Sequence, residues 1–314
     1  MTNFLMKHKF ANFIVILIII FAFGLPAGAG LIFFDSYESY DTGVKNFYDN
    51  NNPDKWKQTG VKDENNYYQV ISSFARAGGK SIEYHSYRTS PNIGYRNQSV
   101  AWGGLGSGRL IHLYEGNEYW VGFSVYLPED FVCDGCISNI YANELLVQFF
   151  GIPDDGETDA RNPCVAFLVV KGNWELLLHS DSHPITKNKA YERTKKYTIG
   201  SWPGDTGKWT DWVFNFKVDY TAGGYNGGFF KVYKNGVLVV NDTGGNCYND
   251  ADGSYPSFGI YKFSWQEHPT DTVTRIVYLD EIKIGDKNSN LSEVSPEETK
   301  KIDSPKGLSI VHLK

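Results

Sequence analysis

The stretch that decides the fold is Tyr255-Pro256-Ser257-Phe258-Gly259-Ile260-Tyr261-Lys262, which reads with a period of two. In a strand, alternate side chains point to opposite faces of the sheet. Phe258 and Ile260 share one face, which we expect to pack in a core. The other face carries hydroxyl groups and a glycine, which leave room for a ligand near the backbone. The pattern indicates a strand whose outer face binds a polymer.

Segments on both sides of this stretch repeat the alternation. Residues 119–127 and 213–220 alternate apolar with polar or small side chains, and residues 276–284 form a further apolar strand. Asn235-Gly236 lies between two strand-like runs and is a strong signal for a two-residue hairpin. No amphipathic helix longer than two turns and no internal repeat is apparent. The sequence therefore predicts an all-β fold, a single antiparallel β-sandwich of the jelly-roll, concanavalin A-like kind.

The two ends of the chain differ from this central part. Lys7 and Lys9 precede an apolar run over residues 10–23, and Ala27-Gly28-Ala29 has the small-x-small form of a cleavage site. We expect residues 1–29 to be a signal peptide and the mature chain to begin close to Leu31. The alternative is an uncleaved membrane anchor. Residues 30–286 would then form the β-jelly-roll domain, and residues 287–314 a polar, flexible C-terminal tail.

Charge and export narrow the set of partners. The formal net charge is −6, and loss of the two lysines of the leader would make it −8. This balance argues against general nucleic-acid binding, although a local basic groove is compatible with an acidic substrate. We expect a secreted protein, extracellular or periplasmic, that is a monomer and has no membrane contact in its mature form.

The four cysteines follow the leader, and an even number in an exported chain predicts disulfides. One arrangement closes a small loop between Cys133 and Cys136 and joins Cys164 to Cys247, but other pairings are open. A redox pair or half of a zinc site is the alternative for Cys133 and Cys136. No second Cys-x-x-Cys and no His-x-x-x-His accompanies them.

Polar side chains occur on three predicted strands where a plain sandwich would carry solvent-facing filler. Arg96 and Gln98 share one face of their strand, and Gln148 is expected to share a face with Leu146 and Phe150. A buried glutamine without a partner costs free energy, so Gln148 needs a protein partner or a ligand. The third strand is the one that carries Tyr255 and Tyr261.

Residues 116–131, 207–214 and 246–262 resemble the jelly-roll polysaccharide lyases, and the likeness extends over about residues 75–285. This grouping contains heparin lyase I-like and glucuronan lyase-like enzymes, and some alginate lyases share the layout. The resemblance implies cleavage of an acidic polysaccharide by β-elimination, which leaves an unsaturated uronate at the new non-reducing end.

The resemblance also implies roles for individual residues. The family's Arg-x-Glu strand matches Arg96-Asn97-Gln98, its Gln-x-His strand matches Gln148-Phe149-Phe150, and its Lys-x-Gly-x-Tyr strand matches residues 257–261. Tyr261 would be the catalytic phenol, while Gln148 and Arg96 would neutralise the uronate carboxylate. Gln98, Phe150 and Ser257 depart from the family's acid, histidine and lysine.

Elimination needs a neutralised carboxylate, a base for the C5 proton and an acid for the leaving oxygen. A phenol between cations can serve as both base and acid, so Tyr261 with Arg96 and Lys262 nearby could act alone. Since Phe150 replaces the family's histidine, His85 is a second candidate base. His179 is a candidate substrate-binding residue, together with Gln98 and Tyr255.

Each of these residues also has an interpretation without function. Tyr261 could be a packing residue at the core edge, Arg96 could pair with a surface acid, and His179 and His85 could be solvated. A basic run over residues 187–196 is either a solvated loop or a lid over an anionic chain. Asn249, Asp250 and Asp252 offer oxygens for calcium but lack a full ligand spacing, so no cofactor is firmly implied.

The sequence thus predicts a secreted polysaccharide lyase that acts on a uronate-containing anionic polysaccharide, with the particular polymer left open. The main alternative is a non-catalytic carbohydrate-binding β-sandwich, which the loss of the histidine favours. A sandwich-fold glycoside hydrolase would need two suitably spaced carboxylates, and no Glu-x-Asp-x-Glu strand is present.

Overall fold

The computed structural model describes residues 30–46, 56–60, 64–72, 74–88, 96–101, 111–132, 143–157, 161–263, 265 and 272–296. In this part of the chain the regular structure is nearly all strand, with a 3-10 turn, η2, and one short helix, α1. The elements are β1 (Leu31–Asp35), β2 (Trp56–Gly60), β3 (Tyr67–Ile71), β4 (Ser81–Tyr87), β5 (Arg96–Ala101), β6 (Glu118–Tyr126), β7 (Asn143–Gly151), β8 (Val165–Val170), β9 (Asn173–Ser180), β10 (Arg193–Ser201), η2 (Pro203–Asp205), β11 (Trp209–Lys217), β12 (Phe229–Lys234), β13 (Val237–Thr243), β14 (Ser254–Tyr261), β15 (Thr274–Asp286) and α1 (Leu291–Val294).

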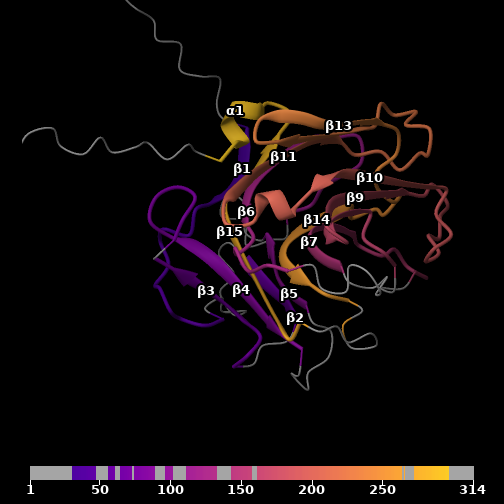
Figure 1. Ribbon diagram of the computed structural model, residues 1–314. Helices are drawn as coiled ribbons and strands as arrows, with labels where there is room; N and C mark the ends of the chain where they lie inside the picture. The colour runs from indigo at the N-terminus through magenta and orange to yellow at the C-terminus, as the bar shows by residue number, and fades with distance from the viewer. Residues whose placement is uncertain are drawn as a thin grey trace, which may run out of the picture.

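Two antiparallel sheets pack face to face (Figure 1). Sheet A has the order β13-β12-β11-β6-β15-β4-β3, with β1 also paired to β15. Sheet B has the order β10-β9-β8-β7-β14-β5-β2. Neighbours such as β7 and β14 are far apart in sequence, which is typical of a jelly roll. The predicted all-β, antiparallel sandwich is therefore confirmed.

Aromatic side chains fill the space between the sheets. Phe167 of β8 stacks on Trp174 of β9 at 5.3 Å between ring centroids, and it meets Trp212 of β11 edge-on at 4.7 Å. All three are buried, and each such ring removes a large apolar area from water. Phe258 and Ile260 belong to the same core, as their alternation predicts.

The hairpin predicted at Asn235-Gly236 joins β12 to β13. Both residues have positive φ, +49° and +78°, which is the conformation that a two-residue hairpin turn requires and that asparagine and glycine tolerate. The predicted hairpin is therefore confirmed, and the signal is strong because asparagine and glycine adopt positive φ more readily than other residues.

The alternation expected for β7 is wrong at its beginning. The register between β7 and β8 shifts between Leu145 and Val147, which marks a β-bulge. Leu146 lies in the core between the sheets, whereas Leu145 belongs to a separate apolar cluster on the outer face of sheet B. Gln148 and Phe150 keep the outward orientation that was predicted for them.

Cys164 and Cys247 are free and buried, and their sulfurs lie 2.9 Å apart. The predicted pair is therefore adjacent, but the structure contains two thiols there and no disulfide. Cys133 and Cys136 lie outside the described residues. Burial raises the pKa of the Cys164 thiol, so this sulfur stays protonated near neutral pH.

The predicted tail begins later than residue 287. Asn290 caps α1 through its side chain, and Val294 is completely buried against β6. A Cβ at Gly122 would meet the Val294 carbonyl oxygen, so this glycine permits the contact. The predicted signal peptide over residues 1–29 lies outside the described residues. None of the helices that the structure describes combines the length and apolar character needed to cross a bilayer.

Candidate active site

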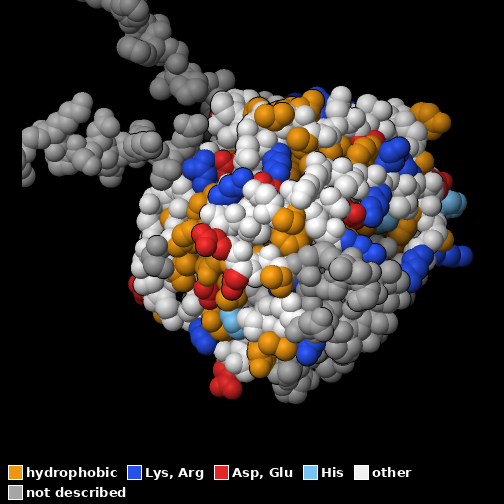
Figure 2. All heavy atoms as spheres, viewed as in Figure 1, with side chains coloured by type: hydrophobic (Ala, Val, Ile, Leu, Met, Phe, Trp, Pro, Cys, Tyr) orange, Lys and Arg blue, Asp and Glu red, His pale blue; other side chains and the backbone are white. Residues whose placement is uncertain are grey.

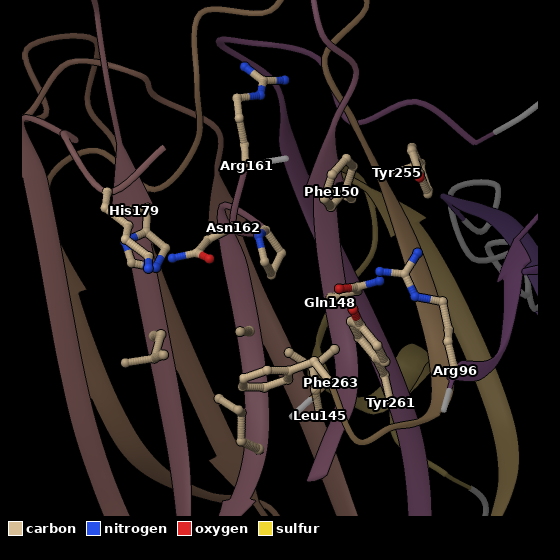
Figure 3. Close-up of a pocket in the computed structure, with 15 residues that line it drawn as sticks. Arg96, Leu145, Gln148, Phe150, Arg161, Asn162, His179, Tyr255, Tyr261 and Phe263 are labelled. Atoms are coloured by element: carbon tan, nitrogen blue, oxygen red, sulfur yellow. The ribbon is translucent and has the colours of Figure 1, made fainter. Parts of the chain in front are cut away.

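A pocket of about 680 Å³ lies on the outer face of sheet B, the face turned away from sheet A (Figure 3). It crosses β5, β7, β8, β9 and β14, so its lining combines three successive strands with one strand from earlier and one from later in the chain. The lining residues are Arg96, Leu145, Gln148, Phe150, Arg161, Asn162, Pro163, Ala166, Leu168, Leu177, His179, Lys189, Tyr255, Tyr261 and Phe263.

Tyr261, Arg96 and Gln148 meet in this pocket, as the sequence predicts. Tyr261 pairs with Arg96 of β5 and with Leu145 of β7 in the sheet, so the phenol lies between the two strands. The Arg96 guanidinium lies 4.2 Å from the centre of the Tyr261 ring. In Figure 3 the Tyr261 hydroxyl points toward Gln148, and the Arg96 guanidinium extends toward the same amide. A phenol, a cation and an amide therefore share one small volume.

Gln148 is held in place by Gln98, its neighbour across β14. The Gln148 amide donates to the Gln98 carbonyl oxygen at 2.9 Å, and both side chains are buried. Gln98 thus supports the site from beneath and does not line the pocket. Between them, Gly259 has a φ of +133°, and a Cβ there would lie 2.3 Å from the Asn97 carbonyl oxygen. Only glycine fits this position.

His179 and Asn162 form the opposite side of the pocket (Figure 3). His179 is buried, contacts the Thr194 hydroxyl through Nδ1 at 3.0 Å and packs against Tyr191. Burial lowers the pKa of His179 to about 4, so the ring is neutral near pH 7. His179 therefore faces the pocket and is not a solvated residue at a strand end.

Two tyrosine hydroxyls fix the backbone of Asn162. The backbone N–H of Asn162 donates a hydrogen bond to the Tyr191 hydroxyl oxygen at 2.9 Å. The Tyr248 hydroxyl donates to the Asn162 carbonyl at 3.0 Å. The side-chain amide is left to project into the pocket. The sequence reasoning missed Asn162 because it precedes β8 and belongs to no periodic segment.

Arg161 was also missed, and its charge is neutralised inside the protein. It binds both carboxylate oxygens of Asp250 at 2.8 Å and one of Glu157 at 2.6 Å. Burial raises the pKa of Asp250 to about 6 in spite of the guanidinium. This ion cluster fixes the wall of the pocket behind Asn162. Asp250 is one of the residues whose oxygens could bind calcium according to the sequence. In the structure, its carboxylate binds the Arg161 guanidinium.

The pocket lining contains three cationic residues and, among the residues that the structure describes, no carboxylate. Arg161 is neutralised, which leaves Arg96 and Lys189 as the charges available to a ligand. In Figure 2 Lys and Arg side chains gather on the right of the face, where Figure 1 places β9 and β10. Lys189 reaches the pocket from the loop between these strands. Within the same basic run, Arg193 pairs with Asp242 and Lys196 with Glu175.

Besides Gln98, Lys262 and His85 are predicted site residues that do not reach the pocket. Lys262 is completely buried and pairs with Glu144 at 3.0 Å, because it follows Tyr261 and points to the opposite side of the strand. His85 lies on β4 of sheet A, stacks on Tyr67 at 4.7 Å and contacts the Asn65 carbonyl. Its neighbour Tyr84 faces the core, so His85 faces away from both the core and sheet B. His85 is not placed to act on a chain in this pocket.

One further group of side chains has donor atoms close together. Asp181, His183 and Glu192 place their donor atoms within 4.8 Å of one another at the ends of the β9–β10 loop. Asp181 already contacts the His183 ring at 2.6 Å, and this contact raises the pKa of His183. The group therefore acts as a hydrogen-bonded clamp at the base of the loop that carries Lys189.

The site is thus a groove on a jelly roll, with cationic residues and no carboxylate among the described residues that line it. The chain belongs to the polysaccharide lyase family, because the family model described as Polysaccharide lyase matches residues 48–283. The resemblance predicted from the sequence is thereby confirmed, and the protein is a polysaccharide lyase. A search of the curated proteins found no match.

Two solved structures of lyases are similar to this chain. The endo-β-1,4-glucuronan lyase of the fungus Trichoderma reesei is similar with a TM-score of 0.62 and 17% identity, covering 86% of this chain and 100% of that one. An alginate lyase from Pseudomonas aeruginosa is similar with a TM-score of 0.45 and 14% identity, covering 74% of this chain and 99% of that one. At 17% identity the likeness to the glucuronan lyase shows the fold alone.

Proposed function

We propose that this protein is a secreted enzyme that cleaves a uronate-containing acidic polysaccharide by β-elimination. One observation carries the proposal: the Tyr261 phenol lies beside Arg96 and Gln148 in a groove whose described lining contains no carboxylate. A glycoside hydrolase would need two carboxylates at the scissile bond. A lyase needs an acid–base group and a means of neutralising the substrate's own carboxylate, and this groove offers both.

The charges of the groove favour a uronate. Within the described part of the chain, no carboxylate pairs with Arg96 or Lys189. An anionic chain would supply the missing partner for both cations, and a positive groove raises the local concentration of a negative substrate. Arg96 and Gln148 lie close enough to share one carboxylate, since both border Tyr261.

The elimination follows from this arrangement. Gln148 and Arg96 donate hydrogen bonds to the uronate carboxylate and stabilise the negative charge that develops when C5 loses its proton. The phenolate oxygen of Tyr261 takes that proton, the C4–C5 double bond forms, and the C4–O4 bond breaks. The same phenol then gives the proton to O4. One chain leaves with an unsaturated uronate and the other with a free hydroxyl, and no water is consumed.

Tyr261 is the only group that we assign to proton transfer. Phe150 occupies the position of the family's histidine and packs against Tyr255 at 6.0 Å between ring centroids. His85 lies on the other sheet, and His179 lies on the far side of the pocket. A single phenol can serve both steps when the C5 proton and O4 lie on the same side of the sugar ring. His179 and Asn162 then bind the chain together on one side of the cleaved bond.

Export rests on the sequence alone. The basic start, the apolar run and Ala27-Gly28-Ala29 support a cleaved leader and secretion. An extracellular place is consistent with a polymer too large to enter a cell. N-terminal sequencing of the protein from culture medium should begin close to Leu31.

The test is to incubate the mature protein with a panel of uronate polymers and to follow the ultraviolet absorbance of the unsaturated product. The solved glucuronan lyase with the same fold makes β-1,4-glucuronan the first polymer to try, followed by alginate and glycosaminoglycans. Appearance of the absorbance is expected with at least one polymer. Retention of a polymer without any absorbance would instead identify a carbohydrate-binding protein.

A further inference from the structure

The pocket has two unlike halves, which meet at Tyr261 (Figure 3). One half contains Gln148, Asn162 and His179 and can hydrogen-bond with a hydroxylated, charged sugar. The other half, where Figure 3 places Leu145 and Phe263, is apolar. Both halves lie on the outer face of sheet B, and the second is the unexpected one because the outward face of a sandwich sheet is usually polar.

Three aliphatic side chains form the floor of the apolar half. Leu145, Ala166 and Leu168 come from β7 and β8, and each is only 3% exposed. Leu177 and Tyr261 pack against them, and the cluster is separate from the core between the sheets. The β-bulge in β7 creates this floor, because it turns Leu145 outward while Leu146 stays in the core. The floor is therefore a built part of the pocket.

This floor suits a methyl group better than a hydroxyl group. Apart from the Tyr261 phenol, the side chains that the structure describes here carry no hydrogen-bonding atom. A sugar hydroxyl pressed against it would lose its water without gaining a partner, which is unfavourable. A methyl group would bury apolar surface against several side chains. Phe263, which is 44% exposed and 5.8 Å from Tyr261 between ring centroids, is free to cover one face of the same sugar.

We propose that the sugar next to the cleaved uronate carries a methyl group that occupies the floor formed by Leu145, Ala166 and Leu168. The methyl belongs either to an O-acetyl ester or to the C6 carbon of a 6-deoxy sugar. The inference rests on the proposed lyase function, because Tyr261 defines where the cleaved uronate lies. It specifies the substrate class as a polymer in which uronate is accompanied by a methyl-bearing residue.

Two pairs of polymers distinguish the two sources of the methyl group. The first pair is an O-acetylated polyglucuronate and the same polymer after mild alkaline deacetylation. The second pair alternates uronate with a 6-deoxyhexose or with the corresponding hexose. The kcat/KM of the full mature protein should be about 10-fold or more higher for the methyl-bearing member of one pair. Binding of the same polymers to the protein, measured by calorimetry, should show the same order.

Variants connect the preference to the floor. Leu168→Asn keeps the branched shape of the side chain and removes its apolar character. The kcat/KM for the methyl-bearing polymer divided by that for its partner should then be close to one. Leu177→Gln at a half-buried position provides a second variant if the first does not fold. Leu238→Gln on the exposed edge strand β13 is the matched control and should keep the parent ratio.

The outcomes separate the two proposals. Cleavage and binding with a ratio of one in both pairs would overturn the methyl-bearing class and leave the lyase proposal intact. Binding that prefers a methyl-bearing polymer, without an unsaturated product from any polymer, would support the floor and overturn the lyase proposal. A parent ratio that survives both Leu168→Asn and Leu177→Gln would also refute the assignment to this floor.

Discussion

The outer faces of the two sheets arise from the same alternation of side chains, but their polar side chains differ in whether they find partners within the protein. On sheet A, outward-facing polar side chains find partners in the protein: Asp211 of β11 binds Arg76 of the loop before β4 at 2.8 Å, and Gln69 donates to Glu83 at 3.0 Å. On sheet B, the outward-facing Arg96 and the amide of Asn162 are turned toward a pocket. Within the described residues, no ion pair or side-chain hydrogen bond satisfies either of them.

This difference identifies the outer face of sheet B as the candidate functional face more clearly than residue composition does. Both faces contain aromatic rings, cations and amides, so neither stands out by residue type. Polar groups that are satisfied by the protein stabilise the sheet, whereas groups that are positioned but unsatisfied are available to a ligand. Matched substitutions on the two faces therefore test whether the functional assignment is correct.

The largest difference is expected for tyrosine. Tyr261→Phe keeps the ring and removes only the hydroxyl, and cleavage should fall by about 10²–10⁴-fold, the usual contribution of positioned acid–base catalysis. Polymer binding and melting temperature should hardly change. The matched control is Tyr126→Phe on sheet A, whose ring packs against Phe74 and Trp209. Initial rates from product absorbance give both values, and equal rates for parent and Tyr261→Phe would remove Tyr261 from the mechanism.

The glutamine pair should give the next largest effect. Gln148→Ala removes the donor that faces the substrate carboxylate, so kcat should fall by about 10²-fold. The melting temperature should fall slightly as well, because Gln98 loses its partner. Gln69→Ala breaks the corresponding contact on sheet A and should leave kcat unchanged. Similar rate losses from both glutamine variants would mean that a general change in the sandwich causes them.

Local patterns in the sequence predicted one face of this comparison well. The outward orientation of Tyr261, Arg96 and Gln148 depends only on alternation within short strands, and the hairpin at Asn235-Gly236 depends on two residues. The orientation of Leu145 could not be predicted, because a β-bulge depends on the register of the neighbouring strand. His85 was predicted as a second candidate base, but the sheet that carries it is decided by pairing between distant strands, which places it on sheet A.

Long-range pairing explains the other differences. Lys262 binds Glu144, which lies 118 positions earlier, and no local pattern marks such a partner. Arg161 and Asn162 precede β8 and carry no periodicity, so their position in the pocket depends on Asp250 and on the hydroxyls of Tyr191 and Tyr248. Fold class follows from local periodicity, whereas the composition of a pocket follows from which strands meet.

His179 should make the stability of the protein sensitive to acid. Burial lowers the pKa of His179 to about 4, whereas an unfolded histidine titrates near 6.5. As the pH falls from about 6.5 to 4, the unfolded chain binds a proton that folded His179 does not, so stability is lost over this window. A pKa shift of one unit corresponds to about 1.4 kcal/mol, so the free energy of unfolding should fall by about 2–3 kcal/mol over this window. Other titrating groups cancel when variants are compared.

Denaturant unfolding of His179→Gln and of the parent at pH 7 and pH 4.5 measures this effect. The variant lacks the acid-dependent loss, so its free energy of unfolding relative to the parent should rise between the two pH values. The lost contact with Thr194 adds an offset that does not depend on pH. His85→Gln on sheet A is the control, and it should also keep the parent's cleavage rate. A pH-independent difference for His179→Gln would contradict a buried neutral ring.

The smallest expected effect concerns the loop cation of the pocket. Lys189→Ala should raise KM by about two- to five-fold with little change in kcat, since an exposed charge contributes about 1 kcal/mol or less to binding. The increase should shrink as salt is added, because salt screens exposed charges. Lys195→Ala is the matched control: Lys195 lies over the Tyr197 ring on β10 and does not line the pocket. If both lysine variants raise KM equally, the basic run attracts the polymer as a whole and Lys189 has no particular place in the groove. If only Lys189→Ala does so, the cation acts within the pocket, on the same face as Arg96.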